Sequence, residues 1–219
     1  MIINSISDVE KYYKMNRSGI EALRLTKMLD RTAEIFNDEV MAVIKDKKII
    51  DAGCSDGTLT SLLLDNGASQ VRGFDKDEDN VAVANFLFES KGCNFDVADL
   101  NDPSTYSELL TNMDIMTMFG ITYYITDIKK FIETISNSGI NTLIIETMYT
   151  SVKQAKKPPE LGFGRTKSWA WSIDEIEEAL DSVWNVAHEK QFRLNTGETF
   201  SHGQRMKDRV ILIAQRKND

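Results

Sequence analysis

Short apolar runs alternate with amphipathic runs through the middle of the chain, and this alternation constrains the fold more than any other feature. The apolar runs predict strands over 47–53, 70–75, 94–100, 113–120 and 141–149. The amphipathic runs predict helices over 58–68, 77–92, 104–112 and 127–139. Strands joined through helices in this way form right-handed crossovers, so the strands lie parallel and helices cover both faces of the sheet.

The rhythm changes after residue 149. Residues 150–171 contain Pro158, Pro159, Gly162 and Gly164, and we expect a long loop there. A helix is predicted over 172–183, where Ser172 and Glu175 have the spacing of a capping box.

Two late strands are expected at roughly 183–193 and 208–216. The polar stretch between them is too short for a helical crossover, so they should pair antiparallel. The predicted fold is therefore an α/β, Rossmann-like, seven-stranded, mostly parallel sheet with helices on both faces and an antiparallel C-terminal strand pair.

Residues 8–45 carry apolar side chains near helical spacing, which predicts two helices. We expect residues 1–45 to form an N-terminal helical segment that packs on the core, and residues 46–219 to form the main domain with the loop 150–171.

Charge and cysteine content narrow the class of protein. The formal net charge is −8, which disfavours nonspecific binding to nucleic acid without excluding a local basic patch. Cys54 and Cys93 form no CxxC pair, and no run approaches 18 apolar residues, so we expect a cytoplasmic protein without a membrane partner. No His-x-x-x-His pair, cysteine cluster or EF-hand loop indicates a metal site.

The stretch "IIDAGCSDGT", residues 49–58, places two glycines and two acids at the end of a buried strand. Ligands of an open parallel sheet bind at the carboxyl ends of its strands. Gly53 and Gly57 would let the backbone approach such a ligand, and the following helix N-terminus favours an anionic group. Asp51 suits a ligand that also carries a cation, although it could simply cap the turn.

Two more acids follow at the next strand ends. Asp75 ends the second strand, where a carboxylate can accept hydrogen bonds from both hydroxyls of a ribose. Asp99 ends the third strand, where it can accept a hydrogen bond from an adenine amino group while the backbone of Ala98 contacts the ring edge. Alternatively, Asp75 caps the helix that begins near Asp77, and Asp99 only begins a turn.

With these residues in place, the chain resembles the class I S-adenosylmethionine-dependent methyltransferases. Their motif acid-x-Gly-x-Gly-x-Gly appears as "DAGCSDG", with Ser55 in place of the middle glycine. The resemblance implies S-adenosylmethionine (SAM) as cofactor, with the demethylated product S-adenosylhomocysteine (SAH). The residues that it implies for cofactor binding are Asp51, Gly53, Cys54, Ser55, Gly57, Asp75, Lys76, Ala98, Asp99, Phe119 and Gly120.

A nicotinamide-dependent dehydrogenase is the competing enzyme class, because it also needs a glycine turn and a ribose acid. Its turn is GxGxxG, whereas Gly53 and Gly57 here fall as G-x-x-x-G. The antiparallel ending of the sheet also favours the methyltransferase. A catalytically silent SAM-binding subunit that serves a partner remains a further alternative.

The sequence says less about the site that binds the methyl acceptor, because no single residue type is required there. Methyl transfer needs a general base only when the nucleophile holds its proton tightly. Tyr124, Glu146 and Arg165 are the predicted catalytic residues. The loop 150–171 forms a basic and aromatic stretch, and we expect a lid that binds a small-molecule or nucleotide-like anionic substrate. The other candidates near this side are Tyr123, Tyr149, Trp169, Trp171 and His202.

A second resemblance is to relatives of the tRNA wobble-uridine carboxymethyltransferases. It rests on "MFGITYYITDIKKFIETI" followed by "LIIETMY". Those proteins often carry Tyr-His where this chain has Tyr123-Tyr124. A tRNA substrate is thus possible, but the net charge does not favour it.

Overall fold

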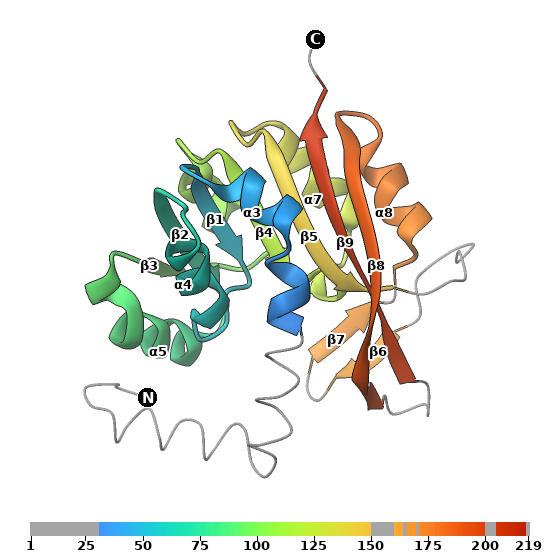
Figure 1. Ribbon diagram of the computed structural model, residues 1–219, viewed down its shortest axis with the longest axis horizontal. Coiled ribbons are helices and arrows are strands. Elements are labelled where there is room, and N and C mark those ends of the chain that lie inside the picture. Colours follow the sequence, from blue (N-terminus) through green and yellow to red (C-terminus); the bar gives the residue numbers. More distant parts are fainter. Residues whose placement is uncertain (1–30, 150–159, 164–165, 170, 200–204, 218–219) are drawn as a thin grey trace.

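The computed structural model describes residues 31–149, 160–163, 166–169, 171–199 and 205–217, with side chains for 31–149, 171–193 and 208–217. Seven strands form one sheet in the order β3-β2-β1-β4-β5-β9-β8 (Figure 1). Its parallel strands are β1 (Lys48–Ala52), β2 (Gln70–Asp75), β3 (Asn94–Val97), β4 (Ile115–Phe119) and β5 (Thr142–Met148).

The antiparallel end of the sheet consists of β8 (Trp184–Thr199) and β9 (Arg205–Arg216). β9 lies between β5 and β8 and pairs antiparallel with both. The predicted Rossmann-like fold and its antiparallel C-terminal pair are confirmed.

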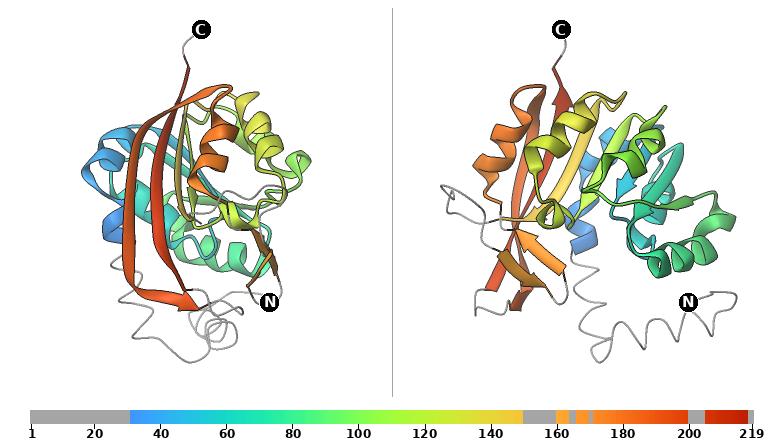
Figure 2. Two further views of the ribbon diagram at one scale, coloured as in Figure 1. Left: turned by 90° about the vertical axis from the view of Figure 1, so that its right-hand side faces the viewer. Right: turned by 180° about the vertical axis from the view of Figure 1, so that it is seen from behind.

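Helices cover both faces of this sheet (Figure 2). One face packs against α3 (Asp38–Ile44), α4 (Thr58–Asp65) and α5 (Glu78–Phe88). The other face packs against α6 (Pro103–Tyr106), α7 (Ile128–Ser136) and α8 (Ile173–Leu180). Because both faces are covered, β4 is buried along its whole length, as expected of a central parallel strand.

Local sequence explains the two helices nearest the C-terminal strands. In α7 the buried side chains fall at i, i+3, i+4 and i+7, a stripe that faces the sheet and is made of Ile128, Phe131, Ile132 and Ile135. In α8 the predicted capping box is present: Ser172 Oγ accepts from the Glu175 amide at 3.2 Å, and Glu175 Oε2 accepts from the Ser172 amide at 2.8 Å.

The helix predicted over 104–112 is wrong in its length. The structure has only α6, followed by a 3₁₀ helix, η2 (Ser107–Leu110). The Ser107 hydroxyl donates to the carbonyl oxygen of Pro103 at 2.5 Å, and such side-chain bonds compete with a regular helix.

The segment 150–171 contains more structure than the predicted loop. Strands β6 (Glu160–Phe163) and β7 (Thr166–Trp169) pair antiparallel, with Phe163 opposite Thr166. The two residues between them, Gly164 and Arg165, lie outside the described residues. A Gly-x pair is typical of a two-residue hairpin, and this signal was missed.

The late strands also extend further than predicted, because their pairing continues past a register shift between Arg193 and Glu198. A strand that shifts register can carry polar residues that a strict alternation does not predict.

The edge of the sheet that matters for function lies where the chain order reverses. From β1 the chain proceeds to β2 and β3 on one side, whereas β4 and β5 lie on the other. The arrowheads of β1 and β5 point to the same, lower edge in Figure 1. Loops that follow β1 and β4 therefore flank a crevice, which is where open parallel sheets bind ligands.

The N-terminal segment reaches this edge from the side of α3. Residues 31–35 are helical, and Ile35, Val40 and Ile44 are buried in the core beside α4. The division at residue 45 stays a prediction, and residues 1–30 lie outside the described residues.

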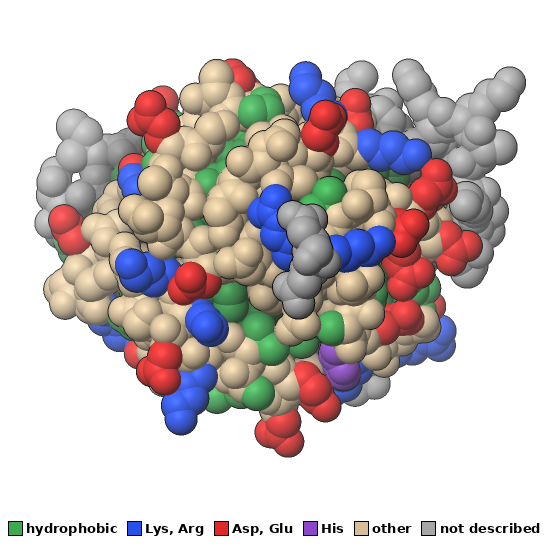
Figure 3. All heavy atoms as spheres, turned by 90° about the horizontal axis from the view of Figure 1, so that it is seen from above, with side chains coloured by type: hydrophobic (Ala, Val, Ile, Leu, Met, Phe, Trp, Pro, Cys, Tyr) green, Lys and Arg blue, Asp and Glu red, His purple; other side chains and the backbone are tan. Residues whose placement is uncertain are grey.

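The opposite edge of the molecule, seen in Figure 3, carries charges of both signs, with acidic side chains gathered on the side of α8. A shallow groove there is lined by Asp174, Glu177, Glu178 and Asp181 together with the start of β8. In the described part of the chain, no helix has the length and apolar character needed to cross a bilayer.

Candidate functional site

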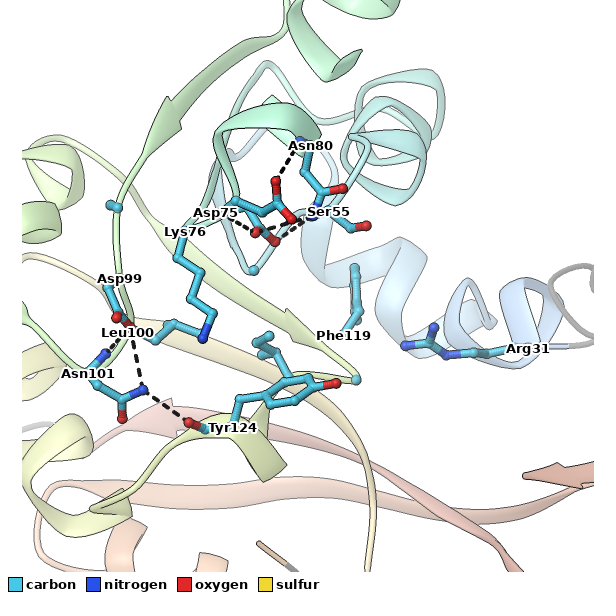
Figure 4. Close-up of a pocket in the computed structure, with 15 residues that line it drawn as sticks. Arg31, Ser55, Asp75, Lys76, Asn80, Asp99, Leu100, Asn101, Phe119 and Tyr124 are labelled. Atoms are coloured by element: carbon cyan, nitrogen blue, oxygen red, sulfur yellow. Dashed lines mark hydrogen bonds between the residues drawn. The ribbon is translucent and has the colours of Figure 1, made fainter. Parts of the chain in front are cut away.

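A cavity of about 380 Å³ opens at the carboxyl ends of β1 to β4 (Figure 4). Each of these four strands contributes residues from its carboxyl end or from the loop that follows it. The cavity is lined by Arg31, Gly53, Ser55, Asp75, Lys76, Asp77, Asn80, Ala98, Asp99, Leu100, Asn101, Phe119, Gly120, Ile121 and Tyr124.

The loop after β1 forms one wall because its backbone can take conformations that side chains disfavour. Gly53 has φ +71°, and a Cβ there would lie 2.4 Å from the side chain of Ile121. Only glycine therefore lets the loops after β1 and β4 approach this closely. Ser55 also has a positive φ, +52°, which a glycine would adopt with less strain.

Asp75 fixes that loop and faces the cavity. Its Oδ2 accepts a hydrogen bond from the Ser55 amide at 3.0 Å, and its Oδ1 accepts from the Asp77 amide at 2.9 Å. Burial raises the pKa of Asp75, while these hydrogen bonds act in the opposite direction. Figure 4 shows its carboxylate beside Ser55 and Asn80, where it could receive the hydroxyls of a sugar.

Asp99 lies at the other side of the cavity, with Ala98 and Leu100 next to it in the lining. Its Oδ1 accepts from the Asn101 amide at 2.9 Å, so the predicted turn is also present. The Asn101 side chain then donates to the carbonyl oxygen of Tyr124 at 3.1 Å. Asn101 thus ties the turn after β3 to η3 (Thr122–Tyr124), the 3₁₀ helix after β4.

Three of the predicted cofactor residues, Asp51, Cys54 and Gly57, lie beneath the lining. Asp51 is 2 % exposed, and its carboxylate accepts from the hydroxyls of Thr60 at 2.6 Å and Thr117 at 2.8 Å. Burial raises the pKa of Asp51 to about 6, against the opposing effect of these two hydrogen bonds. In this position Asp51 holds β1, β4 and α4 together rather than facing a ligand.

Cys54 and Gly57 have packing roles at the same place. Cys54 is buried, and burial raises the pKa of its thiol far above the usual range. Gly57 has φ +78° and lies against the ring of Phe95, where a Cβ would approach to 2.7 Å.

The end of β4 supplies the third side of the cavity. Phe119 lines it and contacts Phe36 across a ring-centroid distance of 6.2 Å. Tyr124 lines it from η3, and its ring lies 4.8 Å from that of Tyr123. In Figure 4 the Tyr124 phenol points away from Asp99 toward the side of Arg31.

Glu146, one of the predicted catalytic residues, is not a lining residue, and its surroundings do not suit a general base. It is fully buried on β5 between Arg31 and Arg209. Burial acts to raise its pKa, but the charges and hydrogen bonds of the two arginines outweigh burial and lower the pKa to about 2. A carboxylate held this firmly in its charged form is a poor acceptor of a substrate proton.

The remaining predicted residues lie elsewhere. Trp171 is buried and donates from Nε1 to the carbonyl oxygen of Thr122 at 3.2 Å, so it supports η3. Tyr149 donates to Gln191 Oε1 at 2.8 Å, away from the cavity lining. Arg165 and His202 lie outside the described residues, and the side chain of Trp169 is not described.

Sequence reasoning missed six lining residues: Arg31, Asp77, Asn80, Leu100, Asn101 and Ile121. Four of them adjoin predicted residues and could have been found by extending the motif by one or two positions. Asn80 lies on the first turn of α5, one helical turn after its N-cap Asp77. Arg31 has no local signal, because its partner Glu146 is 115 positions away.

Within the described ranges, no group of three or more His, Cys, Asp or Glu side chains could hold a metal ion. The polar groups of the cavity are instead arranged for an organic ligand with hydroxyl and amino groups.

Comparison with known families identifies this arrangement. A family described as "Methyltransferase domain" matches residues 44–195, which include the strands that build the cavity. No curated protein matches significantly in sequence.

Solved structures share the fold at low sequence identity. A SAM-dependent methyltransferase from Mesorhizobium loti is 15 % identical, with 87 % of this chain and 98 % of that chain covered and a TM-score of 0.61. A magnesium protoporphyrin IX methyltransferase from Synechocystis PCC 6803, with bound SAH, is 16 % identical, with coverages of 96 % and 94 % and a TM-score of 0.63.

A third structure is a putative methyltransferase in complex with the Trm112 methyltransferase activator of Haloferax volcanii. It is 16 % identical, with 90 % of this chain and 94 % of that chain covered and a TM-score of 0.64.

Proposed function

The chain belongs to the methyltransferase domain family, as a class I SAM-dependent methyltransferase, and on that premise we propose that it methylates an anionic small-molecule or nucleotide-like acceptor. One observation carries the placement of the cofactor: Gly53, Asp75, Asp99 and Phe119 converge on one cavity from four strand ends. These residues supply an open backbone, two carboxylate acceptors and an aromatic wall.

The residues of the cavity fit SAM from one end to the other. The carboxylate of Asp75 would hold the ribose hydroxyls, and Asp99 with the backbone of Ala98 would hold the adenine. Gly53 and Gly120 line the same cavity, and the chain that joins the ribose to the amino acid would run along their backbone. This placement directs the reactive sulfonium toward Phe119 and Tyr124.

Methyl transfer would depend more on the position of the acceptor than on acid–base catalysis by side chains. When SAM is bound, its sulfonium supplies an activated methyl group that an acceptor can attack in line. The protein would hold the acceptor along that line, and such positioning supplies much of the rate enhancement. Tyr124 is the nearest predicted catalytic side chain in the lining, and we assign its hydroxyl to orienting the acceptor.

The anionic character of the acceptor rests on the segment after β5. Lys153, Lys156, Lys157, Arg165 and Lys167 make this segment basic in an otherwise acidic chain. The strand β7 that ends this segment packs beside η3, the turn that carries Tyr124. Lys167 lies on this strand, and a basic strand next to η3 supports an anionic acceptor.

The first experiment measures SAH binding by calorimetry and then screens anionic metabolites, nucleotides and tRNA for release of SAH from SAM. We expect SAH binding and turnover with an anionic acceptor. Tyr124→Phe should then reduce kcat, while the control Tyr149→Phe, whose hydroxyl bonds Gln191 outside the cavity, should not. Turnover of neutral acceptors alone would contradict the acceptor class, and failure to bind SAH would contradict the cofactor placement.

A further inference from the structure

The charged residues that line the cavity are unevenly distributed along it. Asp75 and Asp99 lie toward one end, together with Lys76 (Figure 4). Arg31 lies at the opposite end, beyond Phe119. A ligand that extends from Asp99 past Asp75 therefore reaches a guanidinium group at its far end.

Arg31 is held in place by a carboxylate that the solvent does not reach. Its Nε and Nη2 donate to Oε2 of Glu146 at 3.2 and 2.5 Å. Glu146 also accepts hydrogen bonds from Arg209. The Nε of Arg209 donates to Oε1, and its Nη2 donates to Oε2 at 3.0 Å. Two arginines therefore share a single buried anion.

The guanidinium of Arg31 keeps one side toward the cavity. Its side chain is 25 % exposed, and among the described residues none accepts a hydrogen bond from its Nη1. An arginine that lines a cavity and is fixed on one edge is well placed to form a charge-assisted pair with a bound carboxylate.

The backbone of Gly120 lets the guanidinium of Arg31 lie against this end of the cavity. Its φ is +71°, and a Cβ there would lie 2.6 Å from Nη2 of Arg31. Any side chain at position 120 would displace the guanidinium. The positive φ and the close approach both require glycine, so glycine at this position preserves the placement of Arg31.

We propose that Arg31 binds the amino-acid carboxylate of SAM, and that Glu146 and Arg209 are positioning residues that hold Arg31 toward it. The inference rests on the proposed placement of adenine at Asp99 and ribose at Asp75. With those groups in place, the amino-acid end of the cofactor extends toward Gly53, Gly120 and Arg31. A carboxylate in a partly enclosed cavity needs a cationic partner, and Arg31 is the lining cation at that end.

An acceptor carboxylate would have the same chemistry at Arg31, so the test must separate the two sources. The probes are SAH and its decarboxylated analogue S-adenosylthiopropylamine, which differ only in the carboxylate. Calorimetry with both ligands on wild type and Arg31→Gln gives the energy of the Arg31–carboxylate pair free of other effects.

We expect Arg31→Gln to weaken SAH binding by about 10- to 100-fold, as for loss of a charged hydrogen-bond partner. Binding of the decarboxylated analogue should change by less than about twofold, because it lacks the group that Arg31 holds. The matched control is Arg72→Gln, which breaks the ion pair with Asp96 outside the cavity and should leave both affinities unchanged.

The positioning role of Glu146 predicts that Glu146→Gln lowers the preference for SAH over the analogue, although Arg31 is intact. Arg31→Lys keeps the charge and should restore part of that preference in comparison with Arg31→Gln. If Glu146→Gln does not fold because two arginines lose their anion, the two Arg31 variants still decide the proposal.

Equal weakening of both ligands by Arg31→Gln would overturn the proposal and leave Arg31 a structural role. Unchanged SAH affinity with an increased KM for the acceptor would assign the carboxylate to the acceptor instead. If wild type binds neither probe, the cofactor placement itself fails, and that result differs from the failure of Arg31 alone.

Discussion

Oδ2 of Asp75 accepts a hydrogen bond from the backbone amide of Ser55 at 3.0 Å, which joins the end of β2 to the loop after β1. The same carboxylate faces the cavity, so it shapes the loop and is available to a ligand. A substitution of Asp75 would therefore remove both a hydrogen bond that holds the loop and an acceptor that faces the ligand.

We expect Asp75→Ala to weaken binding of both SAM and SAH by about 1.5–3 kcal/mol, because a charged acceptor for the ribose is lost. Calorimetry with each ligand measures the effect. The surface variant Asp65→Ala, which loses only an exposed pair with Lys91, is the control and should bind as wild type does. Unchanged affinity in Asp75→Ala would refute the ribose assignment.

Ser55 allows a test of backbone strain within the glycine loop. Its φ of +52° costs about 1 kcal/mol for a residue with a Cβ, but glycine loses a similar amount of chain entropy on folding. Ser55→Gly should therefore change the free energy of unfolding by less than about 0.5 kcal/mol and retain SAH affinity. Ser55→Val should destabilise by more than about 1 kcal/mol, since a β-branched residue tolerates this conformation poorly.

Denaturant titrations measure both Ser55 variants, and calorimetry compares their SAH affinities. A large loss of affinity in Ser55→Gly would show that the hydroxyl itself contacts the cofactor, contrary to a loop that acts through its backbone.

Asp51 predicts a specific dependence of stability on pH. Its pKa is raised to about 6 by burial, so the folded protein binds a proton more tightly than the unfolded chain. Its contribution to stability is therefore fully present below about pH 4 and is lost as pH rises to about 6. The difference from an ordinary aspartate pKa of about 4 is worth about 3 kcal/mol.

The measurement is the free energy of unfolding between pH 4 and 7 for wild type and Asp51→Asn. The difference between the two proteins should change across this interval and become constant above about pH 6.5. Curves that run parallel from pH 4 to 7 would show that Asp51 has an ordinary pKa.

We expect substitutions in the β6–β7 hairpin to affect acceptor binding and to leave cofactor binding unchanged. Replacing Arg165 and Trp169 with alanine should raise the KM of an anionic acceptor or abolish turnover, because this segment borders η3. SAH affinity should remain within about twofold, since Asp75, Asp99 and Gly53 lie on other strand ends. Steady-state kinetics and calorimetry check the two halves, and full activity in the double variant would reduce the hairpin to a surface connection.

The sheet and its acidic strand ends were predictable because they follow from local patterns. Each parallel strand is a short segment centred on apolar residues, with Asp75 at the end of β2 and Asp99 two residues after β3. Helix α8 was predictable for the same reason, because the capping box spans only Ser172 to Glu175. Patterns that span only a few residues predict local structure well, because distant residues have little influence on it.

The predicted residues that lie outside the cavity lining depend on distant partners. Asp51 fits the motif of a ligand contact, but Thr117 reaches its carboxylate from β4, 66 positions later. Glu146 was predicted as a catalytic residue near a strand end, whereas Arg209 and Arg31, 178 positions apart in the sequence, both form ion pairs with its carboxylate. No pattern in the sequence reveals such pairings before the strands are ordered.

The position of β9 also has a consequence for the newly made chain. β8 leaves the ribosome first, yet it has no neighbour in the sheet until β9 is complete and inserted beside β5. Until then, the carboxylate of Glu146 lacks the counter-charge of Arg209, and the segment from β5 to β8 exposes apolar strands. The half of the sheet that borders the acceptor side must therefore assemble after β9 has been made, and a nascent chain stalled before residue 209 would be a target for chaperones and proteases.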